Sequence, residues 1–165
     1  VDVWHCDAMG DYSDVGSQSG QKYLRGYQVT DAHGNVRFIS IYPGYYPGRT
    51  AHIHFRVRKF DGDGNTTFNF VSQMYFDDTV TDGIYARVDP YSGRAARNTR
   101  NSNDGIYNEA CLMRLSDNET HAVGSFNVVI NAENGITDAR CTPTDPDSME
   151  HLHDFGGGTP PIRTA

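Results

Sequence analysis

The chain has 165 residues, which is the length of one domain, and 37% of them are hydrophobic, enough to bury a core without disulfides or metal. Its net charge is −7 and its arginines are scattered, so we expect no nucleic acid partner. The longest apolar runs, such as residues 126–130, are far too short to span a bilayer, so we expect no membrane segment.

The N-terminal half predicts strands. Val-Asp-Val-Trp at the start alternates like a strand already under way, and we expect that residues upstream of Val1 are missing. Residues 24–30 and 35–41 alternate on either side of an Asp-Ala-His-Gly-Asn turn, which predicts a hairpin. Residues 51–59 and 67–76 flank a second turn rich in Asp and Gly, and predict two longer strands.

The second half is less regular. Residues 78–85 predict one short helix, capped by Asp77 or Asp78, and residues 124–130 predict a late strand. Residues 89–107 are rich in Asn, Arg, Ser and Gly and predict a long surface loop, the kind of loop that tends to be functional.

Short strands with Gly and Asp turns, and few helical signals, predict an all-β fold. We expect a β-sandwich of about eight strands with long loops, forming a single catalytic core domain over residues 1–165. The Pro- and Gly-rich sequence after Ile130 predicts an extended C-terminal arm.

The chain has three cysteines, Cys6, Cys111 and Cys141, without the close spacing of a zinc ribbon or a redox pair. They allow one disulfide and one free thiol, and a Cys6–Cys111 pair is one hypothesis. Few lysines and a possible disulfide favour an extracellular, secreted protein.

The pattern His52-Ile53-His54 lies in one of the predicted strands. Residues i and i+2 of a strand point to the same face, so both imidazoles suit one metal ion. The alternative is a pair of histidines that only pack or face solvent. A second His-x-His pattern, at residues 151–153, stands in a polar tail and is better explained as solvated.

A Pro-Gly-Tyr-Tyr-Pro-Gly-Arg loop at residues 43–49 precedes the histidine pair and folds back toward it. A tyrosine there can reach a metal held by His52 and His54. The tyrosine pKa is near 10, so a phenolate at neutral pH needs a strong Lewis acid, and ferric iron fits this better than zinc. Simple packing in the loop is the alternative role for Tyr45 and Tyr46.

Three segments together resemble the intradiol ring-cleavage dioxygenases, the ferric enzymes that act on catechol and protocatechuate. They are a strand and turn at residues 1–13, a hairpin at 27–41 and the Pro-Gly-Tyr-Tyr-Pro-Gly-Arg-Thr-Ala-His-Ile-His-Phe motif at 43–55. The resemblance covers roughly the first half of the chain, up to Phe76.

The resemblance implies that non-haem Fe(III) is held by two tyrosinates and two histidines, which fall on Tyr12, Tyr46, His52 and His54. It implies that a catechol-type ring is cleaved by O2 between its two hydroxylated carbons to give a muconic acid. The resemblance also implies that Tyr46 leaves the iron and acts as a base, and its position in a Gly/Pro loop rather than a strand is consistent with this role.

By the same resemblance, Arg49 would stabilise negative charge on the substrate and Gln73 would lie near the substrate ring. A surface salt bridge for Arg49 and a plain strand position for Gln73 are the alternatives. The short segment from Tyr46 to His52 resembles a secreted branch of the family, and we expect a monomer or weak homodimer.

Two other functions are the alternatives. A cupin-like metal enzyme usually has a Glu four or five residues after the second histidine, where this chain has Arg58 and Lys59. A non-catalytic, secreted transthyretin-like binding module would not require Tyr12, Tyr46 and both histidines together. A colour test separates these functions, since tyrosinate bound to Fe(III) absorbs visible light.

Overall fold

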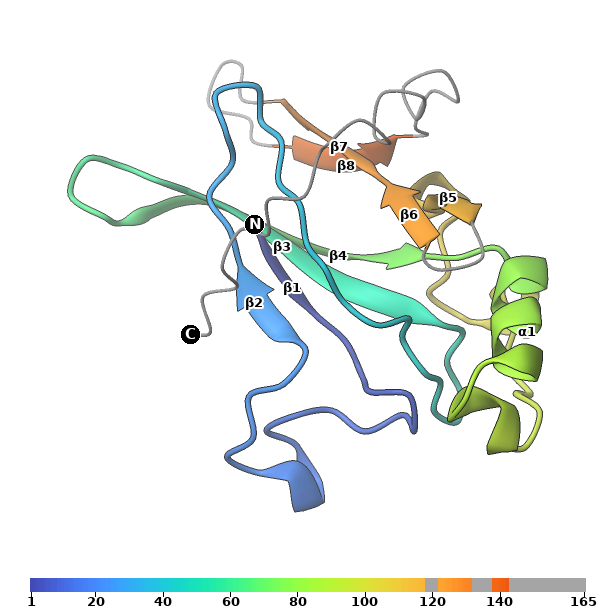
Figure 1. The fold of residues 1–165 in the computed structure, drawn as a ribbon. Helices are drawn as coiled ribbons and strands as arrows, with labels where there is room; N and C mark the ends of the chain where they lie inside the picture. The colour runs from blue at the N-terminus through green and yellow to red at the C-terminus, as the bar shows by residue number, and fades with distance from the viewer. Residues whose placement is uncertain (118–121, 132–137, 143–165) are drawn as a thin grey trace.

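The computed structural model describes residues 1–117, 122–131 and 138–142. Within this part of the chain the fold is mainly β, with eight strands and one α-helix (Figure 1). The largest sheet has four strands in the order β2-β1-β3-β4. These strands are Arg25–Tyr27 (β2), Asp2–Trp4 (β1), His52–Phe60 (β3) and Thr66–Tyr75 (β4).

The four-stranded sheet is antiparallel. Strands β3 and β4 form a long hairpin in which β3 is a central strand and β4 is an edge strand. The register aligns Trp4 of β1 with His54 of β3, and His54 with Gln73 of β4. The next row pairs His52 with Tyr75. Directly paired residues of a sheet point to the same face, so both histidines share a face with Trp4, Gln73 and Tyr75.

The opposite face of the sheet carries the main hydrophobic core. Phe55 is 1% exposed, and its ring lies 5.8 Å from the ring of Phe70 and 5.3 Å from that of Phe126. Burying one such side chain contributes about 1.5–3 kcal/mol. The core therefore anchors β3 from behind while its histidines face the other way.

Two further hairpins follow in the chain. Strands β5 (Arg114–Asp117) and β6 (Ala122–Ser125) form one, and β7 (Asn127–Asn131) and β8 (Asp138–Thr142) form the other. Val128, Ile130 and Ala139 of the β7–β8 hairpin pack on the Phe55 cluster, and Figure 1 shows this hairpin above the large sheet.

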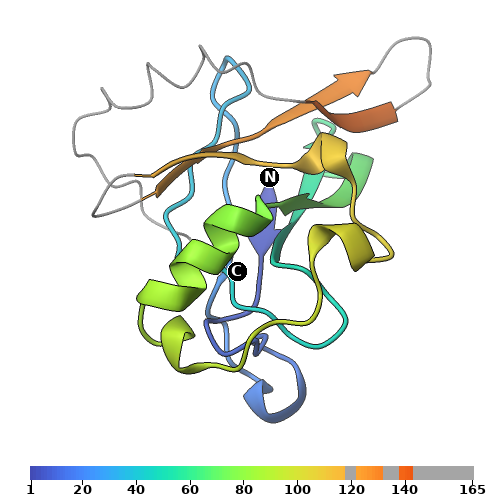
Figure 2. The same cartoon turned by 90° about the vertical axis from the view of Figure 1, so that its right-hand side faces the viewer.

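Helix α1 (Asp78–Arg87) begins at Asp77, whose side chain accepts hydrogen bonds from the backbone N–H of Thr79 and Val80. The helix lies at one end of the sheet, beside β4 (Figure 2). Ile84 is buried and packs in a small cluster with Ala8 and Tyr91.

The segment after α1 only partly matches the predicted surface loop. It contains the short 3-10 helices Tyr91–Gly93 and Asn101–Asn103, and it buries Arg97 and Asp104. The Arg97 guanidinium pairs with Asp78 and Asp82 of α1 at 2.6 and 3.0 Å. Charge pairing therefore fixes this segment against the helix.

The predicted all-β class is confirmed, and so are the central strands, the helix and its Asp77 cap. The predicted strand at residues 35–41 is wrong: the turn closes with a 3.0 Å bond from Asp31 N to Asn35 O, but the following residues are not a strand. Ile39 and Ile41 there are about half exposed and lack the packing that would hold a strand. The late strand is two strands, because the chain breaks at Phe126 to place its ring on Phe55.

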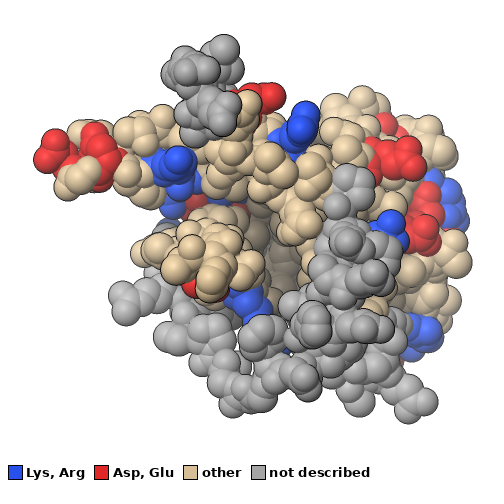
Figure 3. Space-filling model, turned by 90° about the horizontal axis from the view of Figure 1, so that it is seen from above, with Lys and Arg blue, Asp and Glu red and all other residues tan. Residues whose placement is uncertain are grey.

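The sandwich architecture remains a prediction, and the C-terminal arm and the histidines at 151–153 lie outside the described residues. No helix in the described part of the chain is both long and apolar enough to cross a membrane. Seen from above, the Lys and Arg side chains of the described residues lie apart from one another, with no continuous basic surface on this face (Figure 3).

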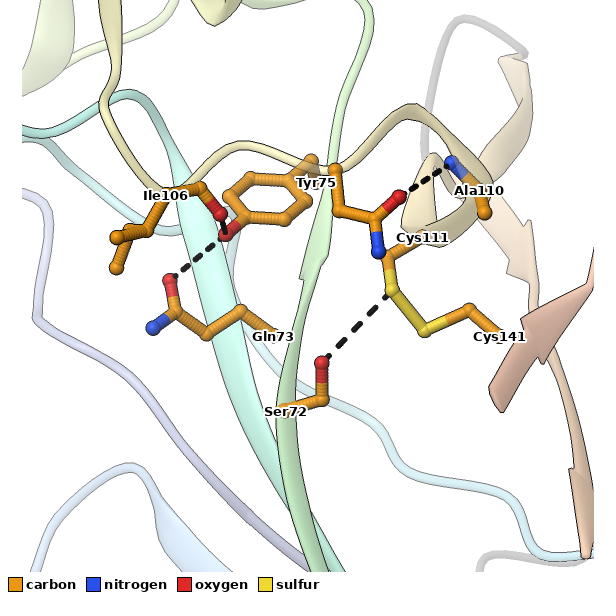
Figure 4. Close-up of a disulfide and its surroundings, with 8 residues drawn as sticks. Ser72, Gln73, Tyr75, Ile106, Ala110, Cys111 and Cys141 are labelled. Carbon is orange, nitrogen blue, oxygen red and sulfur yellow. Dashed lines mark hydrogen bonds between the residues drawn. A yellow bond between two sulfur atoms is a disulfide. The ribbon is translucent and has the colours of Figure 1, made fainter. Parts of the chain in front are cut away.

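The hypothesis of a Cys6–Cys111 disulfide is wrong. Cys111 is bonded to Cys141, which joins the segment before β5 to β8, and Cys6 is a buried free thiol. Ser72 of β4 lies beside this disulfide, on the face opposite to Gln73 and Tyr75 (Figure 4). Sequence spacing alone does not determine cysteine pairing, which depends on how the late hairpin packs.

We expect the Cys111→Ala/Cys141→Ala variant to lose about 3–4 kcal/mol in its free energy of unfolding, because the disulfide closes a loop with a sequence separation of 30. Urea unfolding measures this. Dithiothreitol should lower the free energy of unfolding of the wild type to that of the variant, and should not change the free energy of unfolding of the variant. Equal stability of the two oxidised proteins would contradict a stabilising role.

Candidate metal centre

Strand β3 presents His52 and His54 side by side on the face away from the core. Their Nε2 atoms are 3.2 Å apart. The Trp4 ring stacks on His54 with ring centres 5.0 Å apart and an angle of 3° between the planes. The strand thus sets the spacing of the imidazoles, and Trp4 fixes the orientation of one of them.

Both tyrosines singled out in the sequence reach these histidines. The hydroxyl of Tyr46 is 3.1 Å and that of Tyr12 is 3.3 Å from His52 Nε2. Tyr45, the neighbour of Tyr46, instead directs its hydroxyl to the carbonyl of Ala95. Of the two adjacent tyrosines, the fold therefore brings Tyr46 into the group.

His52 Nε2 has more close polar neighbours than hydrogen bonding explains. A ring nitrogen carries either one proton or one lone pair, yet His52 Nε2 has three polar neighbours at 3.1–3.3 Å. Ligand atoms about 2.0–2.1 Å from a common metal ion lie about 3 Å from one another. The three distances that meet at His52 Nε2 are therefore of the size expected between ligands of one metal ion.

The protonation of the histidines suits metal binding. His52 Nδ1 lies 2.7 Å from the carbonyl of Thr50, which only accepts, so Nδ1 carries the proton and Nε2 presents its lone pair. Burial lowers the pKa of His52 to about 4; burial together with the neighbouring His52 also lowers the pKa of His54 to about 4. Both imidazoles are neutral at neutral pH, the form that binds metals.

Tyr12 constrains which metal fits. Burial, together with the nearby Tyr46 hydroxyl, raises the pKa of Tyr12 above its ordinary value. Ionising it therefore requires a strongly acidic cation. Among the described residues no cluster of three or more His, Cys, Asp and Glu occurs, so the donors beside the imidazoles are phenol oxygens. A hard, highly charged ion such as Fe(III) fits this donor set.

Arg49 and Gln73 lie beside the tyrosines and histidines and contact each other. A terminal nitrogen of Arg49 donates to Gln73 Oε1, and the Tyr75 hydroxyl is 3.2 Å from the same oxygen. The Tyr75 hydroxyl also lies 2.8 Å from the carbonyl of Ile106 (Figure 4). Arg49 does form a salt bridge, as the alternative expected, but its partner Asp104 is buried rather than at the surface, with a side chain that is 1% exposed.

The two tyrosines come from loops that pack backbone against backbone. Tyr12 follows a turn at residues 7–11, and Tyr46 stands in the loop at 43–49; Gly44 N donates to Asp7 O at 3.1 Å. A Cβ on Gly44 would lie 2.6 Å from Ala8 O, and one on Gly10 would collide with Tyr45 O. Only glycine permits this approach.

Arg94 joins the same two loops from outside. Its guanidinium donates to the carbonyls of Ala8 and Tyr45, both at 2.7 Å, and lies 3.9 Å from the centre of the Tyr45 ring. This contact holds the backbone next to Tyr46 against the turn that precedes Tyr12.

Sequence reasoning missed four residues around the site: Trp4, Tyr75, Arg94 and Asp104. Trp4 and Tyr75 reach it through strand register, which a single sequence does not specify. The composition of residues 89–107 marked the segment that supplies Arg94 and Asp104, but not the individual residues. His5, which follows Trp4, is buried, and its Nε2 lies 2.7 Å from the Ser40 hydroxyl rather than at the histidine pair.

Comparison with known proteins identifies the family to which the chain belongs. Residues 1–112, more than half of the chain, match the family model described as Dioxygenase. The chain belongs to the intradiol dioxygenase family. All of the residues grouped here lie within the matched range.

Individual relatives agree with the assignment. The chain is 31% identical over 103 residues to a chlorocatechol 1,2-dioxygenase of Pseudomonas putida, covering 51% of this chain and 40% of the relative. An intradiol ring-cleavage dioxygenase of Tetranychus urticae superposes with a TM-score of 0.62 at 27% identity, covering 74% of this chain and 66% of that one. The dioxygenase Tetur07g02040 superposes with a TM-score of 0.57 at 28% identity, covering 70% and 61%.

The chain thus spans less than half of the curated relative and 66% or less of these solved structures. Membership of the intradiol dioxygenase family excludes the cupin-like alternative. Consistent with this, Arg58, at a position where a cupin would have its Glu, forms an ion pair with Asp2.

The turn beside Tyr12 occurs three times, which offers a controlled test of the loop contact. Residues 7–11, 31–35 and 61–65 share one geometry: an Asp Oδ1 accepts two backbone N–H bonds, and a Gly follows at positive φ. The φ angles of Gly10, Gly34 and Gly64 are 96°, 86° and 85°. Only Gly10 of these three faces another backbone.

We expect Gly34→Ala and Gly64→Ala to cost about 1–2 kcal/mol each, the cost of a side chain in this conformation. Gly10→Ala should cost about 1–3 kcal/mol more, because it also pushes Tyr45 away. Urea unfolding measures both effects. The metal-to-protein ratio should fall in Gly10→Ala alone, and equal values in the three variants would contradict the loop contact.

Proposed function

We propose that this protein is a non-haem Fe(III) dioxygenase that cleaves catechol-type rings with O2, between the two hydroxylated carbons, to give muconic acids. Tyr12, Tyr46, His52 and His54 would hold the iron. One observation carries the proposal: three donors converge on His52 Nε2 within 3.3 Å, and two of them are tyrosine hydroxyls. Membership of the intradiol dioxygenase family supports it.

When bound, Fe(III) would supply the Lewis acidity that keeps the two tyrosines ionised and activates a chelated catechol toward O2. The two phenolates would offset most of the metal charge, so the site accepts a doubly deprotonated catechol with little net charge. The two neutral imidazoles add no charge and hold the donor geometry through the rigid strand β3.

The two tyrosines would have different roles. Tyr46 lies in a loop of Gly and Pro residues, so its Oη can turn away and take a proton from a catechol hydroxyl. Tyr12 lies close to the Tyr46 ring, with ring centres 5.6 Å apart, and would remain a fixed ligand.

Arg49 and Gln73 would orient the substrate. The Arg49 guanidinium would stabilise negative charge that develops on the ring and on the bound oxygen atoms. Gln73 Oε1 accepts from Arg49, so the amide nitrogen of Gln73 is the group that would donate to a substrate oxygen.

The remaining expectations stay proposals. We propose one catalytic core domain, a monomer or weak homodimer, and secretion to the extracellular space. The Cys111–Cys141 disulfide supports the location, because disulfides persist mainly in oxidising compartments.

The central test combines metal content, colour and turnover. Wild-type protein loaded with Fe(III) should show a broad visible band from tyrosinate and take up O2 with at least one of catechol, protocatechuate, hydroxyquinol or a larger lignin-type catechol. His54→Ala should lose iron, while His33→Ala, in an exposed turn, should keep it. Colourless iron-loaded protein would favour a non-catalytic binding module.

We expect Tyr46→Phe to shift the visible band and to slow turnover about 100-fold, because it removes a ligand and a base. Tyr45→Phe is the matched control, since its hydroxyl bonds Ala95 O rather than the histidines. Absorption spectra and O2 uptake measure the two effects. If Tyr45→Phe caused the larger change, the assignment of the ligand to Tyr46 would be wrong.

A further inference from the structure

Asp104 stands 55 residues away from Arg49 in the sequence and accepts a hydrogen bond from its Nε. We propose that Asp104 is a positioning residue: its buried carboxylate fixes the direction in which Arg49 presents its guanidinium to the substrate. The inference rests on the proposed function and adds a residue to it.

The contacts of Asp104 fill both of its oxygens. Oδ2 accepts from Arg49 Nε and from the backbone N–H of Thr50, both at 2.9 Å. Oδ1 accepts from the backbone N–H of Ile106 at 3.0 Å. The side chain of Asp104 is 1% exposed, and backbone N–H groups of Thr50 and Ile106 bind its two oxygens. The carboxylate is therefore fixed in place even if Arg49 moves.

The carboxylate is charged in this position. Burial opposes its ionisation, but the hydrogen bonds from Ile106 and Thr50 and the Arg49 guanidinium outweigh it, so the pKa of Asp104 is lowered. A charged acceptor makes the bond to Arg49 about twice as strong as a neutral one.

Two contacts fix the plane of the Arg49 guanidinium. Nε is bound to Asp104, and one terminal nitrogen is bound to Gln73 Oε1. Arginine is a long side chain with much rotamer freedom, and a planar fork held at two points loses that freedom before substrate arrives. Its remaining N–H groups are thereby preorganised, which is what transition-state stabilisation requires.

The same carboxylate oxygen also connects to the metal ligands. Asp104 Oδ2 accepts a hydrogen bond from the backbone N–H of Thr50. The carbonyl of Thr50 in turn accepts a hydrogen bond from His52 Nδ1 at 2.7 Å. Residues Arg49 to His52 are therefore set by one anchor on the segment at 101–106. In the Asn variant one oxygen remains to accept from Thr50, so His52 is expected to stay in place while Arg49 loses its charged partner.

The test is a double-mutant cycle with Asp104→Asn and Arg49→Lys. Asp104→Asn should lower kcat about tenfold with KM nearly unchanged, and in the Arg49→Lys background it should add less than about twofold. Iron content and the visible band should match the wild type. A full tenfold effect in the Arg49→Lys background, or loss of iron, would overturn the assignment.

The matched control is Asp82→Asn. Asp82 pairs with Arg97 and Arg100 on the same segment but does not touch Arg49. It should lower the thermal midpoint of unfolding and leave kcat near the wild-type value. A fall in kcat as large as that of Asp104→Asn would show that general loosening of the segment explains the effect, and would overturn the proposal.

A second measurement needs neither turnover nor a variant of Asp104. In wild-type protein loaded with diamagnetic Ga(III), the 15N-labelled Nε–H of Arg49, assigned through Arg49→Lys, should exchange slowly with water, like that of buried Arg97. Exchange as fast as in exposed Arg37 would overturn the inference. If the wild type cleaves no catechol, the proposed function fails and the substrate-positioning role fails with it, whereas a fast exchange rate in an active enzyme overturns the role of Asp104 alone.

Discussion

Two neutral imidazoles on adjacent same-face positions of β3, with their Nε2 atoms 3.2 Å apart, set the constraint on which the rest of the site depends. His52 Nε2 presents one lone pair, because its Nδ1 donates to Thr50, yet three polar groups lie within 3.3 Å of it: His54 Nε2 and the hydroxyls of Tyr46 and Tyr12. One lone pair accepts one hydrogen bond well, so hydrogen bonding accounts for only part of this convergence. The rest of the fold holds the four groups at a spacing that suits the ligands of one shared cation.

The donors are supplied in two physically different ways. The histidines stand on a strand whose opposite face is anchored by Phe55 in the core, so their spacing follows from β geometry. The tyrosines stand on loops whose positions come from glycine-mediated backbone contact and from Arg94. The spacing of the histidines is therefore set by the strand, and the positions of the tyrosines by contacts between loops; under the proposed function Tyr46 alone would leave its place, while Tyr12 and the histidines would stay.

The sequence predicted the parts of this site that depend on local geometry. The His-x-His alternation predicted two imidazoles on one face, and the Pro-Gly-Tyr-Tyr loop predicted a tyrosine within reach. The choice of Tyr12 and of Tyr46 over Tyr45 came from the resemblance to a family rather than from spacing. Alternation and resemblance did not reveal four residues: Trp4 and Tyr75 depend on strand register, and Arg94 and Asp104 on contacts between residues that are 49 to 86 positions apart in the sequence.

The same reasoning explains the errors in the fold. Residues 35–41 have the alternation of a strand, but Ile39 and Ile41 are about half exposed and none of the seven residues is fully buried, so the pattern alone did not produce a strand. Cysteine pairing failed for a related reason, because Cys141 is brought to Cys111 by the β7–β8 hairpin. Local pattern fixes which face a residue takes within a strand, while long-range packing decides which strands and charges meet. Arg49 is the case where both are needed, since its place beside the ligand loop is local and its direction is set by a distant carboxylate.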